Sequence, residues 1–266
     1  MQNSVIIITG ASSGIGRQIA LDLAQQGEYD LILVGRNQQH LMDVVATIQQ
    51  TTPTKAWPYR YDLSQAEQID QFIEDIDSSF QRIDALIACA GYGQFKLATE
   101  FTYQEMMAMF KVNTLGTMYL TTCLAQRMVD QGFGRITIIA SVAGQMATMR
   151  SSVYSASKFA IIGYANSLRL ELKRKGISVT VVNPGPVATP FFATSPELIT
   201  YYQKVKRFLI SPQYVSKKVI DYLFARKAKR EITLPCYFNL LHLCYKLFPN
   251  FGDFVASEIL NFKEDL

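Results

Sequence analysis

The stretch that decides the fold is Thr9-Gly10-Ala11-Ser12-Ser13-Gly14-Ile15-Gly16, which begins at the last residue of the apolar run Val5–Thr9. Glycines let a chain turn sharply from a strand into a helix and let the backbone approach a bound diphosphate. The free amide groups of the following helix favour the same negative charge. A turn that binds nothing is the alternative, which the position after an N-terminal apolar strand disfavours. The expected dinucleotide contacts come from Gly10, Ser12, Ser13, Gly14, Ile15 and Gly16.

Short runs rich in β-branched residues alternate with helical patterns along the rest of the chain. Such alternation indicates a parallel sheet, and because most runs are apolar throughout, helices should cover both faces. We predict an α/β, Rossmann-type doubly wound fold with a seven-stranded parallel sheet. The expected strands are Val5–Thr9, Asp30–Val34, Ala56–Tyr61, Ala85–Ala90, Arg135–Ala140, Ser178–Val182 and, more weakly, Glu231–Leu234. The expected helices are Ile15–Gln26, Gln38–Gln50, Ala66–Phe80, Tyr103–Val129, Val153–Lys175 and Pro212–Arg226.

The chain of 266 residues contains no internal repeat or linker, which favours a single main domain. We expect residues 1–235 to form one dinucleotide-binding and catalytic domain, and residues 236–266 to form an apolar C-terminal extension. The segment 184–211 breaks the alternation and contains four prolines. It predicts a loop or substrate lid at the carboxyl edge of the sheet.

Composition excludes several classes of protein. With 49% hydrophobic and 18% charged residues the chain is not disordered, and a net charge of +4 is too small to predict nucleic-acid binding. The four cysteines and two histidines lack the spacing of metal ligands, so we expect no metal. Met1–Ser4 carry no basic side chain and the run Val5–Ile8 is too short for a signal peptide or a membrane span. We therefore expect a cytoplasmic protein with reduced thiols.

Two arginines indicate which dinucleotide is bound. Arg36 lies 20 residues after Gly16, at the end of the second expected strand. An acidic residue there would bind the ribose hydroxyls of NAD, whereas an arginine pairs with the additional phosphate of NADP. Arg17 could reach the same phosphate. The alternative for each arginine is a solvated surface charge.

Tyr154 and Lys158 lie four residues apart and therefore on one face of an expected helix. A free tyrosine titrates near pH 10, so a neighbouring ammonium group that stabilises the phenolate would fit it for proton transfer. Ser141 ends the fifth expected strand at the ligand-binding edge, where its hydroxyl could hold a substrate oxygen.

Taken together and in this order, the motifs resemble those of the short-chain dehydrogenase/reductase family, in its common single-domain branch, over about residues 4–235. The glycine motif of the family matches Thr9–Gly16, its serine matches Ser141, and its Tyr-x-x-x-Lys matches Tyr154 and Lys158.

The resemblance implies further roles. Asn113 would hold a water in a proton relay beyond the lysine, and Asp62 would contact the adenine. The segment Pro184–Thr189 would meet the nicotinamide, with Val187 and Thr189 touching its carboxamide. Besides the glycine loop and the arginines, the implied cofactor contacts are Asp62, Leu63, Ala90, Gly91, Asn113, Tyr154, Lys158, Pro184, Gly185, Val187 and Thr189.

The sequence departs from the family at Cys89, where Cys89-Ala90-Gly91 replaces Asn-Ala-Gly. A thiol cannot donate and accept hydrogen bonds as an amide does. We expect weaker anchoring of this loop or a changed cofactor affinity, with hydride chemistry retained.

The implied function is that of an NADP(H)-dependent oxidoreductase that reduces an apolar or lipid-like aldehyde or ketone to an alcohol. Tyr154 would act as the general acid/base, Ser141 would hold the oxygen, and Lys158 would also bind the nicotinamide ribose. The lid aromatics favour an apolar carbonyl substrate or, alternatively, pack the lid on the body; they are Phe191, Phe192, Tyr201 and Tyr202. The alternative function is a non-catalytic, NADP-binding regulatory or scaffold protein. The family implies a homodimer or homotetramer.

The C-terminal tail combines apolar and basic features. Nine Lys or Arg residues and a single acid occupy Lys204–Arg230, and the stretch after Pro235 is dense in Tyr, Phe and Leu. This pattern fits peripheral contact with an anionic membrane. The alternative is a tail packed on its own domain or on a second subunit, which the single basic residue Lys246 within the apolar stretch favours.

Overall fold

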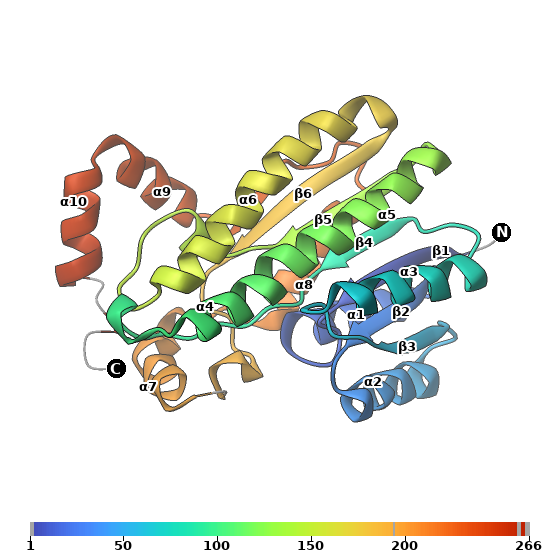
Figure 1. Cartoon of the computed structure of the whole chain (residues 1–266), viewed down its shortest axis with the longest axis horizontal. Coiled ribbons are helices and arrows are strands. Elements are labelled where there is room, and N and C mark those ends of the chain that lie inside the picture. Colours follow the sequence, from blue (N-terminus) through green and yellow to red (C-terminus); the bar gives the residue numbers. More distant parts are fainter. Residues whose placement is uncertain (1–2, 194, 260–261, 264–266) are drawn as a thin grey trace.

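The computed structural model describes residues 3–193, 195–259 and 262–263, and its core is one seven-stranded sheet (Figure 1). All strand pairs are parallel, as predicted. The strands are β1 (Ser4–Thr9), β2 (Tyr29–Gly35), β3 (Ala56–Arg60), β4 (Ala85–Ala88), β5 (Gly134–Ile139), β6 (Ile177–Pro184) and β7 (Glu231–Leu234).

The strand order β3-β2-β1-β4-β5-β6-β7 reverses direction between β1 and β4. In β1, Thr9 is paired with Val34 of β2, while Ile8 is paired with Ile87 of β4. The loops that follow these three strands therefore emerge side by side. Open parallel sheets bind ligands at this point of reversal, so the topology itself selects the site.

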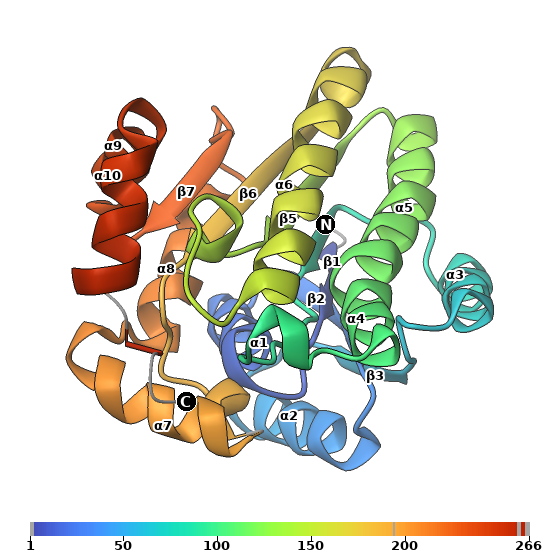
Figure 2. The same ribbon diagram turned by 60° about the vertical axis from the view of Figure 1, so that its left-hand side comes forward.

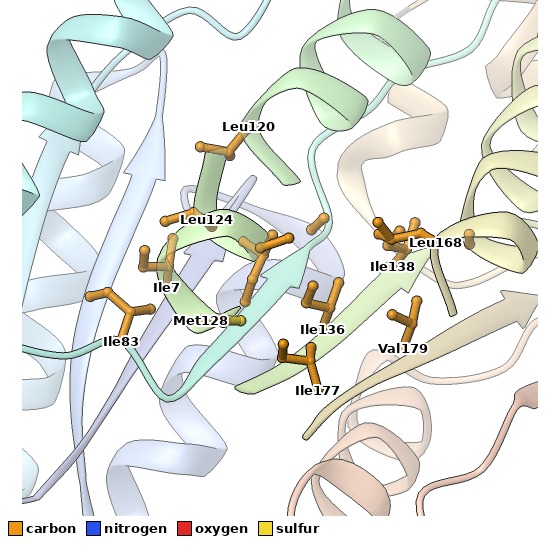
Figure 3. Close-up of a cluster of buried hydrophobic side chains, with 14 of the residues drawn as sticks. Ile7, Ile83, Leu120, Leu124, Met128, Ile136, Ile138, Leu168, Ile177 and Val179 are labelled. Atoms are coloured by element: carbon orange, nitrogen blue, oxygen red, sulfur yellow. The ribbon is translucent and has the colours of Figure 1, made fainter. Parts of the chain in front are cut away.

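Helices cover both faces of the sheet because the strands are apolar on both sides. The helices α1 (Gly14–Gln26), α2 (Gln38–Thr51) and α8 (Pro212–Leu223) pack on one face. The helices α3 (Ala66–Ser79), α5 (Thr117–Gln131) and α6 (Ser152–Leu172) pack on the other. Figure 3 shows the second layer, where Leu124 and Met128 of α5 belong to the same cluster as Ile7 of β1 and Ile136 of β5. The doubly wound prediction is confirmed.

The expected helix Tyr103–Val129 is interrupted. It consists of α4 (Tyr103–Phe110), a π-helical turn at Lys111–Gly116 and then α5. Gly116 lies against the backbone carbonyl of Leu63, where a Cβ would not fit. Such π-turns inside helices are frequent at functional sites, and this one carries Asn113.

The segment 184–211, predicted to be a loop or a lid and called the lid below, is largely helical, since it contains α7 (Pro196–Val205). The proline pattern was misleading here because Pro196 occupies the first turn of the helix, where its missing N–H is not needed. Ser195 caps the helix, its Oγ accepting a hydrogen bond from the Leu198 amide at 3.3 Å.

The tail forms two short helices, α9 (Phe238–Leu247) and α10 (Pro249–Phe254). Figure 2 shows the pair at the end of the sheet beside β7. Neither helix has a buried residue, so most of their apolar side chains face outward. Contact with the domain runs through His242, which lies 3.0 Å from the Gln145 carbonyl oxygen, and through Phe238.

Candidate active site

The glycine loop has the conformation that its residues predict. Gly10 and Gly14 adopt positive φ angles of 66° and 54°. A Cβ on Gly10 would lie only 3.0 Å from the Ala90 backbone, and one on Gly16 would lie 2.5 Å from the Gly10 carbonyl oxygen. A side chain at either position would therefore collide with the chain's own backbone, so this tight turn requires glycine at both.

A groove of about 710 Å³ runs from this loop across the ends of β1 to β4. Many of the predicted cofactor residues line it and therefore share one surface. They are Gly10, Ser12, Ser13, Arg36, Asp62, Leu63, Ala90 and Gly91. Ile15 instead packs against the apolar layer beneath the loop.

The two predicted arginines differ in their positions. Arg36 is exposed and lines the groove, whereas Arg17 is exposed on α1 and is not among the lining residues. Arg60 also lines the groove, although the sequence reasoning missed it. It ends β3 in register with Gly35, next to Arg36. Its position at the end of an expected strand, beside another strand end, is the signal that could have found it.

Tyr154 and Lys158 lie on α6 and face the end of β5, where Ser141 is located. The Lys158 Nζ lies 5.8 Å from the centre of the Tyr154 ring and donates a hydrogen bond to the Ile139 carbonyl oxygen at 3.2 Å. Ser141 is hydrogen-bonded to Tyr154 and also accepts a hydrogen bond from the Ala143 amide at 3.1 Å. The three predicted side chains therefore converge.

Burial dominates the proton affinities of this group. Desolvation raises the pKa of Tyr154 to about 12, and the hydrogen bond from Ser141 opposes that shift. Desolvation lowers the pKa of Lys158 to about 8. The expected lowering of the Tyr154 pKa by Lys158 is not among its causes in this structure. A phenol with a high pKa stays protonated at neutral pH, which is the state that a proton donor requires.

Asn113 lies in the π-helical turn and is almost completely buried. Its Oδ1 accepts a hydrogen bond from the Tyr92 amide at 3.0 Å, and its Nδ2 donates to the Tyr92 carbonyl oxygen at 2.8 Å. Nδ2 also donates to Ser157 Oγ at 3.1 Å, and Ser157 Oγ donates to the Tyr154 carbonyl oxygen at 2.7 Å. Asn113 thus joins the loop after β4 to α6. Neither Tyr92 nor Ser157 was predicted.

The family model described as short chain dehydrogenase matches residues 4–198. The chain belongs to the short-chain dehydrogenase family. An uncharacterized oxidoreductase of Staphylococcus saprophyticus is 36% identical over 190 residues, which cover 71% of this chain and 81% of that protein. The chain is accordingly an oxidoreductase of this family.

Solved structures agree with this assignment. A short-chain dehydrogenase from Streptomyces avermitilis matches over 100% of both chains, with a TM-score of 0.81 and 25% identity. An alcohol dehydrogenase from the archaeon Thermococcus sibiricus, complexed with 5-hydroxy-NADP, covers 88% of this chain and 96% of its own, with a TM-score of 0.79 and 24% identity. The second similarity shows the fold alone.

Cys89, the departure from the short-chain dehydrogenase pattern, lies on a loop that is anchored by another residue. Thr9 Oγ1 accepts hydrogen bonds from the Cys89 and Ala90 amides at 3.0 and 3.1 Å. Burial raises the pKa of the Cys89 thiol to about 12, which makes it a poor nucleophile. Thr9 and Asn113 together hold the loop that contains Cys89, the position at which the family has an asparagine.

The segment after β6 approaches the glycine loop in this short-chain dehydrogenase. A Cβ on Gly14 would lie 3.4 Å from Thr189, so these two loops are in contact. Val187 is buried and forms a bridge with Ile210, while the Gly185 amide donates to the Leu234 carbonyl oxygen at 2.7 Å. The segment predicted to meet the nicotinamide begins at Pro184, the last residue of β6. These contacts hold it at both of its ends.

The lid aromatics form a cluster over Tyr154. Phe95, from the loop after β4, contacts the rings of Tyr154 and Tyr201, with ring centres 5.8 and 5.3 Å apart. Phe191 also contacts Tyr154, at 6.1 Å. Phe192 and Tyr202 extend the cluster. These rings pack the lid on the body, as one of the two sequence interpretations predicted, whereas the apolar carbonyl substrate stays a prediction.

Within the described residues, no group of His, Cys, Asp or Glu side chains could hold a metal ion. Over the same part of the chain, no helix combines the length and the apolarity needed to cross a membrane.

Proposed function

We propose that this oxidoreductase uses NADP(H) to reduce an apolar aldehyde or ketone to an alcohol. The observation that carries the proposal is the convergence of Ser141, Tyr154 and Lys158 at the sheet edge where the groove of the glycine loop also opens. Fold alone does not determine reaction, whereas this arrangement of side chains fits one reaction class.

The groove fits a dinucleotide. The tight turn that Gly10 and Gly16 make possible leads directly into α1, and the N-terminus of a helix favours the negative charge of a diphosphate. Arg36 and Arg60 give the adenosine end two positive charges, which favours the additional phosphate of NADP.

The bound cofactor would supply a hydride to the carbonyl carbon. Tyr154 would donate its phenolic proton to the carbonyl oxygen, so that one hydride and one proton yield the alcohol. The Ser141 hydroxyl would orient that oxygen by a hydrogen bond. Lys158 would place its positive charge behind Tyr154, where it stabilises the phenolate left after proton transfer.

The test is loss of NADPH absorbance, with NADH in parallel, against aldehydes and ketones that range from short aliphatic to long-chain and aromatic. Tyr154→Phe is the matched control, because it removes only the hydroxyl. Turnover with NADPH that is lost in the control is the expected result. Tight cofactor binding without any reduction would instead favour a non-catalytic, NADP-binding regulatory protein, and a preference for NADH would refute the role of Arg36.

We also propose that the protein is a homo-oligomer in the cytoplasm. Outward-facing apolar side chains on the helices of one face support the oligomer, since such patches favour association. They include Leu115, Tyr119, Phe159 and Leu170. Contact of the tail with a membrane stays a prediction, supported by the exposure of Leu240, Leu247, Phe248 and Phe251.

A further inference from the structure

Lys263 is a buried cation that the proposed reaction does not use. It is only 5% exposed, although it lies far beyond the region that matches the family. Its Nζ donates a hydrogen bond to Thr148 Oγ1 at 3.1 Å. Phe262, next to it, contacts the ring of Phe208 with ring centres 5.5 Å apart. The described end of the chain is therefore packed between the lid and the loop after β5.

The surroundings of this ammonium group are aromatic. Its Nζ lies 3.8 Å from the centre of the Phe95 ring and 5.0 Å from that of Tyr201. Phe95 in turn contacts the ring of Tyr154, and the charge of Tyr154 affects the pKa of Tyr201. Lys263 thus belongs to the same cluster as the proposed proton donor, with Phe95 and Tyr201 between them.

The positive charge has no acidic partner among the described residues. Burial alone lowers the pKa of Lys263 to about 7, with no charged group among the causes. Buried ammonium groups are normally paired, because desolvation without a counter-charge is unfavourable. Two ring faces and one hydroxyl compensate only part of that loss.

We propose that Lys263 binds a carboxylate group of the carbonyl substrate, so that the enzyme reduces aldehydes or ketones that carry an acid on an apolar or aromatic body. This inference rests on the proposed function. Phe95 contacts both the ring of Tyr154 and the ammonium group of Lys263, and Phe191 and Tyr201 extend this aromatic surface, so the body of such a molecule would lie along these rings with its carbonyl at Tyr154 and its acid at Lys263. Within an aromatic cluster the ion pair is stronger than it would be in water.

The inference is tested with a matched substrate pair, 4-formylbenzoate and its methyl ester, which differ in charge while keeping the same reacting aldehyde. The ratio of the two kcat/KM values is measured for the wild type, Lys263→Met and Lys263→Arg. Lys246→Met is the control, since Lys246 is exposed on α9. We expect the wild type to prefer the acid, Lys263→Met to reduce that preference about 10- to 100-fold, and Lys263→Arg to restore part of it. Lys246→Met should retain the wild-type ratio.

A second measurement separates this inference from the proposed function. Benzoate has no reducible carbonyl, and its binding is compared with that of benzamide by calorimetry in the wild type and in Lys263→Met. Benzoate binding that depends on Lys263 supports the acid site even where neither aldehyde is reduced, an outcome that would refute only the proposed function. If the substrate ratio and benzoate binding are the same in the wild type and Lys263→Met, Lys263 is a packing residue and the inference is overturned.

Discussion

Asn113 binds both backbone polar groups of Tyr92, accepting from the amide at 3.0 Å and donating to the carbonyl oxygen at 2.8 Å. Replacing Asn113 with Leu keeps the volume and removes these bonds. We expect the free energy of unfolding to fall by about 2 kcal/mol or more, because buried polar groups lose their partners. Asn113→Asp keeps only the hydrogen-bond acceptor, so its free energy of unfolding should lie between those of the wild type and Asn113→Leu. Urea unfolding measures this, and equal stability of Asn113→Leu and the wild type would contradict it.

The hydroxyl of Thr9 is expected to anchor the loop at Cys89. Thr9→Val keeps the shape of the side chain and leaves the amides of Cys89 and Ala90 without their acceptor. We expect a loss of about 1 to 3 kcal/mol in stability and weaker cofactor binding. Thr9→Ser, which retains the hydroxyl, is the matched control. Cofactor affinity is measured by fluorescence titration and stability by thermal unfolding. Equal affinity and equal stability of Thr9→Val and Thr9→Ser would contradict the anchoring role of the hydroxyl.

Cofactor preference should follow the residues that line the groove. Arg36→Ala and Arg60→Ala are each expected to reduce the preference for NADPH over NADH, by about tenfold for Arg36, because each removes a charge-assisted contact to the additional phosphate. Arg17→Ala is expected to change the preference less, since Arg17 does not line the groove. The measurement is the ratio of the dissociation constants of the two cofactors. A larger effect of Arg17 than of Arg36 would reverse our assignment.

The pH dependence of catalysis should reflect Tyr154. Because its pKa is raised to about 12, the phenol is protonated across neutral pH and carbonyl reduction should not lose its proton donor between pH 6 and 9. Alcohol oxidation needs the phenolate, so its rate should rise with pH over the same range. Initial rates in both directions check this. A reduction rate that titrates away near pH 7 with unchanged cofactor binding would rule out Tyr154 as the donor.

Lys158 should lower the stability of the fold at neutral pH. Burial lowers its pKa from 10.5 to about 8, so between these values the unfolded chain holds a proton that the folded chain has released. Stability contributed by this group therefore rises with pH from about 8 to 10. We expect Lys158→Met to be more stable than the wild type at pH 7, by roughly 1 to 3 kcal/mol, and the difference to shrink by pH 10. Urea unfolding at both pH values tests the sign.

The sheet and the glycine loop were predictable because their determinants are local. Apolar strands such as β1 and a turn that requires glycine at position 10 can be recognised within a few residues. The position of Ser141 was predictable because parallel strands deliver their carboxyl ends to one edge of the sheet, whereas its combination with Tyr154 of α6 was implied by the family resemblance.

The remaining features depend on contacts between distant segments. The π-turn at Asn113 arises where Gly116 meets the Leu63 carbonyl, a contact that no local pattern indicates. Arg60 joins the groove only through its register with β2. Lys263 reaches the cluster around Tyr154 from the other end of the chain, and its neighbours in sequence give no sign of its burial.

A Cβ at Gly185 would lie 2.8 Å from the ring of Phe238, so the nicotinamide segment and the first turn of α9 are packed against each other. Changes to the tail are therefore not independent of the reaction centre. An engineer who varies the outer face of α9 to improve solubility should leave Phe238 unchanged, because a displaced ring would free the backbone that the cofactor is expected to contact. Conversely, random libraries that aim to change the substrate range should include Gly185 and Phe238, since substitutions at this contact would shift the segment next to the reaction centre.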